Sequence, residues 1–172
     1  VYDGVNYNFV SKDTKIPVRD NQTFTYSNVS IVQGQYLTDQ YIFDSQYKNA
    51  KFVLSNQRID KSSLEVSVNS NGTINKYSLS TDVSTITSSS RVFYAQENEE
   101  GFTEIYFGDG ILGQGLLDAD IVNATYVIVD DLHADGAKSF TMSDSINSFI
   151  NAQITTISPA SGGTEKESIE SI

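Results

Sequence analysis

The sequence has no cysteine, no tryptophan, two prolines and a single histidine, His133. Without cysteine, a disulfide scaffold, a thiolate metal site and a cysteine nucleophile are all excluded. The longest unbroken apolar run spans only residues 126–129, whereas a membrane helix needs roughly 20 apolar residues, so we expect no membrane insertion. The lone histidine and the lack of a G-x-S-x-G motif argue against a serine hydrolase.

Positive charge is missing from residues 92–137, which carry ten carboxylates and no lysine or arginine in a chain of net charge -11. Such a surface repels a phosphate backbone, so we expect no nucleic-acid partner. The run predicts an acidic face that docks against a basic partner surface, and a solvated acidic rim is the alternative. The candidate interface acids are Glu97, Glu99, Glu100, Asp118, Asp120, Asp130, Asp131 and Asp135.

Most of the polar residues are uncharged, because Ser, Thr, Asn and Gln make up 59 of the 172 residues. Leu64, Val66 and Val68 alternate with polar residues, and an Asn71-Gly72 turn leads into a second run over residues 74–79, which predicts a β-hairpin. We therefore expect a mainly β fold, an antiparallel sandwich or barrel-like sheets with few helices. Further short runs predict strands near residues 24–32, 41–43, 51–54, 91–94, 102–107, 121–129 and 154–157.

The end of the chain has a different pattern. Residues 159–163 interrupt the strands, and Thr164 stands three residues before Glu167, a capping-box spacing that predicts the start of a helix at Glu165. We expect residues 1–158 to form a β-rich domain, with two subdomains of about 1–95 and 96–158 as an alternative. Residues 159–172 are then a linker and the start of a helical region, and the chain is an excerpt of a longer protein.

Residues 108–113 match the G-x-G-x-x-G pattern and follow a predicted strand. A dinucleotide site needs a helix directly afterwards, because the amides at its N-terminus hold the pyrophosphate. None is predicted here, since Gln114 and Gly115 lead into another strand. We interpret the motif as a glycine-rich turn and expect no cofactor and no small-molecule substrate.

Three carboxylates and the only imidazole fall within six residues, at Asp130, Asp131, His133 and Asp135. An iron triad needs a second histidine, a closed zinc site needs more nitrogen or sulfur, and the spacing does not match an EF-hand loop. We therefore predict an exposed acidic turn without a metal. A glycosidase needs only two carboxylates, which sequence alone does not place, so that enzyme class stays open as an alternative.

Residues 104–113 read Glu-Ile-Tyr-Phe-Gly-Asp-Gly-Ile-Leu-Gly, which resembles the F-G-D-G-x-x-G signature of the baseplate J-like family, wedge proteins of contractile phage tails and related injection machines. Two other stretches are similar to that family: the strand from Tyr126 to Asp131 with its continuation to Lys138, and residues 158–168. Residues 28–34 and 58–60 resemble the larger wedge subunits of myovirus baseplates in pattern.

This resemblance implies a non-enzymatic structural subunit in the tail baseplate of a virion, assembled in the host cytoplasm. Its partners would be copies of itself and neighbouring wedge proteins, which form a ring around the hub and rearrange when the sheath contracts. A β-sandwich adhesin that binds glycans is the alternative, because it shares the Ser/Thr/Asn-rich composition. The family motif positions, which the resemblance makes structural, are Phe107, Gly108, Asp109, Gly110 and Gly113.

Overall fold

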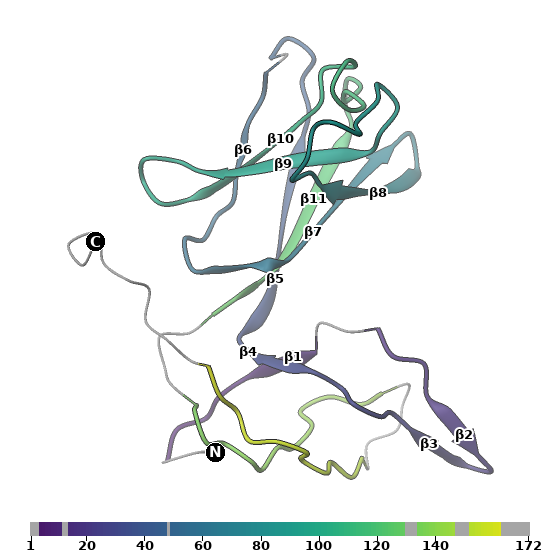
Figure 1. Ribbon diagram of the computed structural model, residues 1–172, viewed down its shortest axis with the longest axis vertical. Coiled ribbons are helices and arrows are strands. Elements are labelled where there is room, and N and C mark those ends of the chain that lie inside the picture. Colours follow the sequence, from purple (N-terminus) through teal and green to yellow (C-terminus); the bar gives the residue numbers. More distant parts are fainter. Residues whose placement is uncertain (1–3, 12–13, 48, 130–133, 147–151, 163–172) are drawn as a thin grey trace. The chain divides into compact units, whose positions relative to one another are not determined.

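The computed structural model describes residues 4–11, 14–47, 49–129, 134–146 and 152–162 (Figure 1). All regular secondary structure in these ranges is strand, and they contain no helix of the length and hydropathy needed to cross a membrane. The predicted mainly β fold is therefore confirmed. The strands are β1 Phe9–Ser11, β2 Val18–Asp20, β3 Thr23–Thr25, β4 Ile31–Gln33, β5 Gln35–Ile42, β6 Phe52–Val53, β7 Ile59–Ser70, β8 Thr73–Leu79, β9 Val92–Glu97, β10 Thr103–Phe107 and β11 Ile121–Ile128.

The chain divides into two compact units. Unit 1 comprises residues 1–34 and 130–172, and unit 2 comprises residues 35–129. The boundary considered near residue 95 falls inside unit 2, where β9 and β10 form a hairpin with Ala95 opposite Ile105. A division there would cut this hairpin, so the structure separates the units elsewhere. The helix expected at Glu165 lies outside the described residues.

Unit 2 is a seven-stranded sheet in the order β5-β11-β7-β8-β9-β10-β6. Neighbouring strands are antiparallel except β8 and β9, which form a short parallel ladder of two residue pairs. The sheet curls until its two edge strands, β5 and β6, meet. At this contact the Tyr41 hydroxyl on β5 donates to the Val53 carbonyl on β6 at 2.6 Å. The result is a nearly closed barrel.

The β7–β8 hairpin confirms the strongest local prediction. Val66 pairs with Tyr77 and Ser70 with Thr73 around the predicted turn. Asn71 and Gly72 have φ values of 51° and 86°, the left-handed conformations that a tight two-residue hairpin turn requires.

The inward-facing residues of the barrel form one hydrophobic core within unit 2. Opposed residues in neighbouring strands share a face of the sheet, and Val122 of β11 lies opposite Val68 of β7. Both are essentially inaccessible to solvent. The other side chains buried to the same degree in this core are Leu54, Phe93, Ile105, Ala124 and Tyr126.

The outward side of β5 and β11 carries what we call the outer polar face: Thr38, Gln40, Asn123 and Thr125. The hydroxyls of Thr38 and Thr125 lie 2.8 Å apart, and the Gln40 amide donates to the Asn123 side-chain oxygen at 2.8 Å. Each pair is directly opposed across the β5–β11 ladder. These side chains therefore satisfy one another's hydrogen bonds across the strands.

Strand β7 contains a long irregular bulge opposite β11. Thr125 pairs with Glu65, but Val127 pairs with Asp60, so residues 61–64 of β7 face Tyr126 alone. The Ser63 hydroxyl fills the break, since it accepts a hydrogen bond from the Val127 amide at 2.8 Å and donates to the Asp60 carbonyl at 2.6 Å. Ser63 thus replaces a missing backbone partner.

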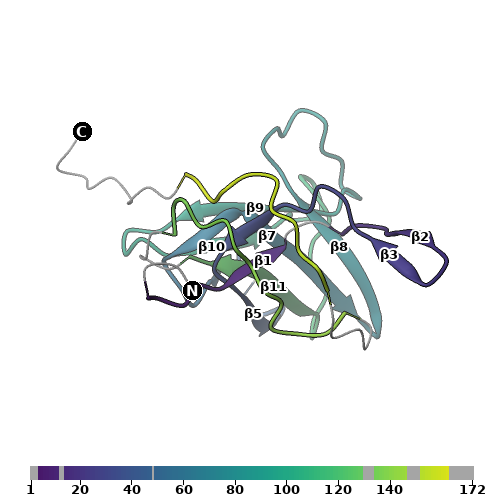
Figure 2. The same ribbon diagram turned by 90° about the horizontal axis from the view of Figure 1, so that it is seen from below.

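Unit 1 contains two small antiparallel pairs, β1–β4 (Figure 1) and the hairpin β2–β3 (Figure 2). The strand predicted over residues 24–32 is divided in two, because Asn28 adopts a φ of 53° between β3 and β4. The strand predicted over residues 154–157 is wrong. Ile154 is 45% and Ile157 78% exposed, so this run has no buried face to hold it in a sheet.

Candidate functional site

The family motif forms a bend over residues 108–113, called here the 108–113 bend, that bonds mainly to itself. The Asp109 carboxylate accepts from the backbone N–H groups of Ile111 at 2.9 Å and Leu112 at 3.1 Å. The Gly110 N–H donates to the Gly113 carbonyl at 3.0 Å. The bonds from Ile111 and then Leu112 hold the pKa of Asp109 below its ordinary value, so this carboxylate is a charged acceptor that fixes the turn.

The bend is also fastened to the start of β9 and the loop before it. The N–H of Gly113 donates to the Thr87 carbonyl at 3.2 Å, and the N–H of Gln114 donates to the Ser90 carbonyl at 2.8 Å. The Tyr94 hydroxyl on β9 donates to the Leu112 carbonyl at 3.2 Å. The motif therefore ties three segments of unit 2 together.

Two of its glycines are required by space. A Cβ on Gly108 would lie 2.4 Å from the backbone of Gly113, which leaves no room for any side chain. Gly113 has a φ of 94°, and a Cβ there would lie 2.8 Å from the Val92 side chain. Glycine thus permits both the left-handed conformation and the close approach.

The bend lacks the geometry of a phosphate cradle. No helix follows Gly113 among the described residues up to β11. The amides of Ile111 and Leu112 already donate to Asp109, whereas a nucleotide-binding loop points such amides at the ligand. These bonds support the turn interpretation over dinucleotide binding.

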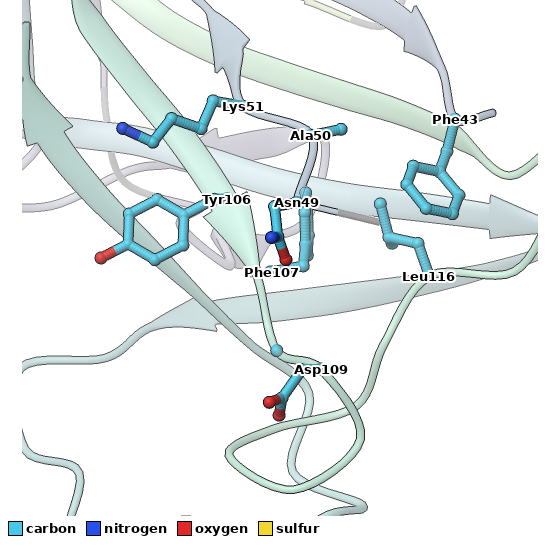
Figure 3. A pocket seen from close by; sticks show the side chains of 9 residues that line it. Phe43, Asn49, Ala50, Lys51, Tyr106, Phe107, Asp109 and Leu116 are labelled. Carbon is cyan, nitrogen blue, oxygen red and sulfur yellow. The ribbon is translucent and has the colours of Figure 1, made fainter. Parts of the chain in front are cut away.

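A shallow depression of about 220 Å³ lies beside the bend (Figure 3). Among the described residues that line it, the one carboxylate is Asp109, whose pKa is lowered by backbone N–H groups. At its rim, Lys51 forms an ion pair with Glu104 at 3.3 Å. The depression therefore lacks the pair of facing acids, one with a raised pKa, that a glycosidase uses. Its principal lining residues are Phe43, Lys51, Tyr106, Phe107, Asp109 and Leu116.

One group of the predicted interface acids lies on the β9–β10 turn, residues 98–102. Glu97 forms an ion pair with Lys61 at 2.8 Å. The Asn98 side-chain oxygen accepts from the backbone N–H groups of Glu100 and Phe102, which fixes the turn. Glu99 and Glu100 are exposed, and within the described part of the chain neither forms an ion pair.

A second group lies at the other end of β10. The Asp118 carboxylate accepts from the Ser45 N–H at 2.9 Å, which lowers its pKa. Asp120 is only 4% exposed and accepts from the Leu117 N–H at 2.8 Å. The structure thus divides the acidic run of residues 92–137 between two ends of the barrel and buries two of its members, Glu104 and Asp120.

The remaining candidate acids belong to unit 1. Asp135 is exposed, whereas Asp130, Asp131 and His133 lie outside the described residues. Over the ranges that the structure describes, no group of three or more acidic or histidine side chains is arranged to hold a metal ion.

Sequence reasoning missed the hydrogen-bonded junction that closes the barrel between β5 and residues 53–55, called here the seam. The Asp39 carboxylate accepts from the Tyr126 hydroxyl at 2.6 Å and from both the N–H and the hydroxyl of Ser55 at 2.8 Å. A signal was present in the sequence: Asp39 occupies a position on β5 that alternation with Leu37 and Tyr41 assigns to the interior.

The seam is charged on one side and neutral on the other. Burial alone would raise the pKa of Asp39, but hydrogen bonds from Tyr126 and Ser55 outweigh it and hold the pKa below the ordinary 3.8. Burial, and then the hydrogen bond to Asp39, raise the pKa of Tyr126 to about 12. At neutral pH the carboxylate is therefore ionised and the phenol protonated.

Comparison with known proteins relates this chain to phage baseplate wedge proteins. Residues 35–129 match the family model described as bacteriophage baseplate wedge protein gp6, third domain. Baseplate wedge protein gp6 of Enterobacteria phage T4 is 26% identical over 188 aligned positions, which cover 96% of this chain and 28% of that protein. The chain thus spans little more than a quarter of the relative's length. Neither match names the baseplate J-like family, so that narrower resemblance stays a prediction.

Proposed function

The chain belongs to the bacteriophage baseplate wedge protein gp6 family through residues 35–129, and we propose on that basis that it is part of a structural subunit of a phage tail baseplate wedge. In this role it binds by protein-protein contact, within the ring around the hub that rearranges on sheath contraction. It performs no catalysis.

One observation carries this proposal. The family match covers residues 35–129, and these are also the bounds of the compact barrel of unit 2. The matched segment therefore contains a complete hydrophobic core rather than a fragment of one. A domain that folds around its own core presents a rigid surface, which suits a part that positions neighbouring subunits.

The proposed partners are further copies of the same subunit and neighbouring wedge proteins, and the proposed location is the virion tail baseplate. Relatedness to the wedge protein of phage T4 supports both. The F-G-D-G-x-x-G motif further supports a structural kinship with baseplate J-like proteins, since its residues fasten an exposed bend in the connection from β10 to β11 instead of lining a reactive centre.

Electron microscopy of phage particles tests the proposal directly. A small tag inserted into the Asn71-Gly72 turn, where both residues are exposed, should appear as extra density in the baseplate. Particles made without the protein should lack complete baseplates. Tag density elsewhere on the virion, or intact baseplates without the protein, would refute the role. On a glycan array the protein should not bind, whereas an adhesin would.

Within this role, the exposed acids of the β9–β10 turn are proposed to face another subunit. The variant Glu99→Lys/Glu100→Lys should reduce incorporation into wedges, because reversed charges repel a partner surface selected for carboxylates. Glu65→Lys is the matched control, since Glu65 is exposed on the outward side of the sheet rather than on a turn. Equal incorporation of both variants would leave the acids as a solvated rim.

A further inference from the structure

The turn of the β7–β8 hairpin contains the one Asn-Gly pair of the sequence, Asn71-Gly72. Both residues are exposed. Among the described residues no hydrogen bond holds the Asn71 side chain, and a Cβ built on Gly72 would meet nothing within 4 Å. The side-chain amide of Asn71 is therefore free to turn toward the backbone nitrogen that follows it.

This pair permits a reaction that needs no enzyme. Solvent hydroxide removes the proton of the Gly72 N–H, and the nitrogen attacks the side-chain carbon Cγ of Asn71. The new N–Cγ bond closes a succinimide ring, while the Cγ–Nδ2 bond breaks and the nitrogen leaves as ammonia with a proton taken from water. Water then opens the ring at either carbonyl, which leaves aspartate or isoaspartate at position 71. No atom is oxidised or reduced.

Other asparagines with the same backbone conformation lack the glycine. Asn21 and Asn28 have φ values of 52° and 53°, close to the 51° of Asn71. They are followed by Gln22 and Val29, whose side chains crowd the nitrogen that would attack. The left-handed turn is therefore common to several sites, whereas the unhindered nitrogen belongs to Asn71.

Two further glycines, Gly110 and Gly136, follow an aspartate whose placement the structure describes. Their N–H groups donate to backbone carbonyls, Gly110 to Gly113 at 3.0 Å and Gly136 to Ala160 at 2.8 Å. An ionised carboxylate also repels an anionic nitrogen and has no ammonia to release. Among the described Asx-Gly pairs, Asn71-Gly72 is thus the reactive one.

The Asn69 side chain holds the attacking nitrogen in place. Its Oδ1 accepts a hydrogen bond from the Gly72 N–H at 2.9 Å. Once that proton is lost, an oxygen lone pair faces a negative charge where it had faced a hydrogen, so the bond favours the protonated, unreactive nitrogen. The ladder pair of Ser70 and Thr73 closes the turn around this contact. The hairpin therefore carries both a reactive pair and a group that slows it.

We propose that Asn71 is a site of spontaneous deamidation in this protein, and that Asn69 sets the rate by retaining the proton of the Gly72 N–H. This inference goes beyond the proposed function, because it concerns a covalent change of the chain itself. Deamidation adds a negative charge to the tip of the hairpin. Isoaspartate also lengthens the backbone between residues 71 and 72, which breaks the two-residue turn that this hairpin requires.

Incubation of the full chain at mildly alkaline pH tests the site. Peptide mapping by mass spectrometry should find the exchange of amide for carboxyl at position 71 faster than at any other asparagine of the described residues, with isoaspartate among the products. The rate should rise with pH, because hydroxide removes the Gly72 proton. Asn71→Gly should abolish the signal and keep the hairpin, since glycine accepts the left-handed conformation. A faster exchange at another described asparagine would overturn the assignment.

Substitutions at position 69 test the restraint. Asn69→Ala should speed deamidation about two- to tenfold, the effect of one neutral hydrogen bond. It should speed solvent hydrogen exchange of the Gly72 amide by a similar factor, since the same bond protects that proton. Asn69→Asp is the matched variant, because its carboxylate still accepts from the Gly72 N–H and its charge further opposes deprotonation. Deamidation of Asn69→Asp should be as slow as in the wild type or slower.

Thr73→Ala separates the hydrogen bond from the stability of the hairpin. It lowers the strand propensity beside the turn but leaves the Asn69 acceptor in place, so deamidation should stay near the wild-type rate. Equal acceleration in Thr73→Ala and Asn69→Ala would assign the restraint to the hairpin as a whole and refute the role of Asn69. An unchanged rate in Asn69→Ala, or a faster one in Asn69→Asp, would refute it as well.

Discussion

At the scale of single residues, Gly108 and Gly110 separate two reasons for glycine in the 108–113 bend. Gly108→Ala should lower the free energy of unfolding by at least about 2 kcal/mol, because its Cβ would overlap the Gly113 backbone. Gly110→Ala should cost only about 1 kcal/mol, since it has a φ of 88° but open space around it. Urea denaturation of both variants measures the difference, and equal losses would contradict the close approach.

Asp39 should make the stability of the barrel dependent on pH. Because its pKa is lower in the folded protein than the ordinary 3.8, the stabilisation is fully present above pH 3.8 and is lost as the pH falls through the folded pKa. Asp39→Asn should cost about 1 to 2 kcal/mol at neutral pH, as expected for hydrogen bonds to a charged group.

The same substitution should flatten the acid side of the stability curve, measured by urea denaturation from pH 7 to about pH 2, because the Asp39 contribution is lost only below pH 3.8. Asp82→Asn is the control, because Asp82 also accepts hydrogen bonds, from Ser84, but lies in an exposed loop. Its effect should be much smaller. An unchanged acid dependence in Asp39→Asn would show that the seam does not contribute.

At the scale of elements, the bulge in β7 depends on one hydroxyl. Ser63→Ala would leave the buried Val127 N–H without its acceptor, so it should lower the free energy of unfolding by about 1 to 3 kcal/mol. It should also speed hydrogen exchange at the Val127 amide. Ser62→Ala, at the exposed neighbouring position, should have little effect on either measurement.

Elements were predictable from the sequence where their cause is local. The β7–β8 hairpin follows from alternation and from two residues, Asn71 and Gly72, that accept left-handed conformations. The run at 154–157 has strand-forming residues too, but among the described residues it pairs with no strand, and Ile154 and Ile157 are exposed. Propensity describes a segment, whereas a strand also needs a partner.

The candidate site was predictable to a similar extent. The 108–113 bend was recognised because its glycines and Asp109 act within six residues. The seam joins Asp39 to Tyr126 across 87 positions, and no pattern in one sequence specifies such a pairing. For the same reason, a run of acids in the sequence does not specify where each acid lies on the fold: β10 separates Glu99 from Asp118.

At the scale of the whole molecule, the core residues of the barrel all lie between Phe43 and Tyr126. A fragment of residues 35–129 should therefore fold alone, with cooperative thermal unfolding and dispersed amide resonances. A fragment of residues 1–95 should not, because it lacks β10 and β11, and β11 pairs with both β5 and β7. An unfolded 35–129 fragment would mean that unit 1 is needed for the stability of the barrel.

The outer polar face bears on where neighbours can attach. Thr38 and Thr125, and Gln40 and Asn123, already bond to each other, so a protein that covered these four side chains would strip away water without gaining new hydrogen bonds from them. These four paired side chains therefore give a crowded copy little to bind during assembly, unlike the exposed Ile42 beside them on β5.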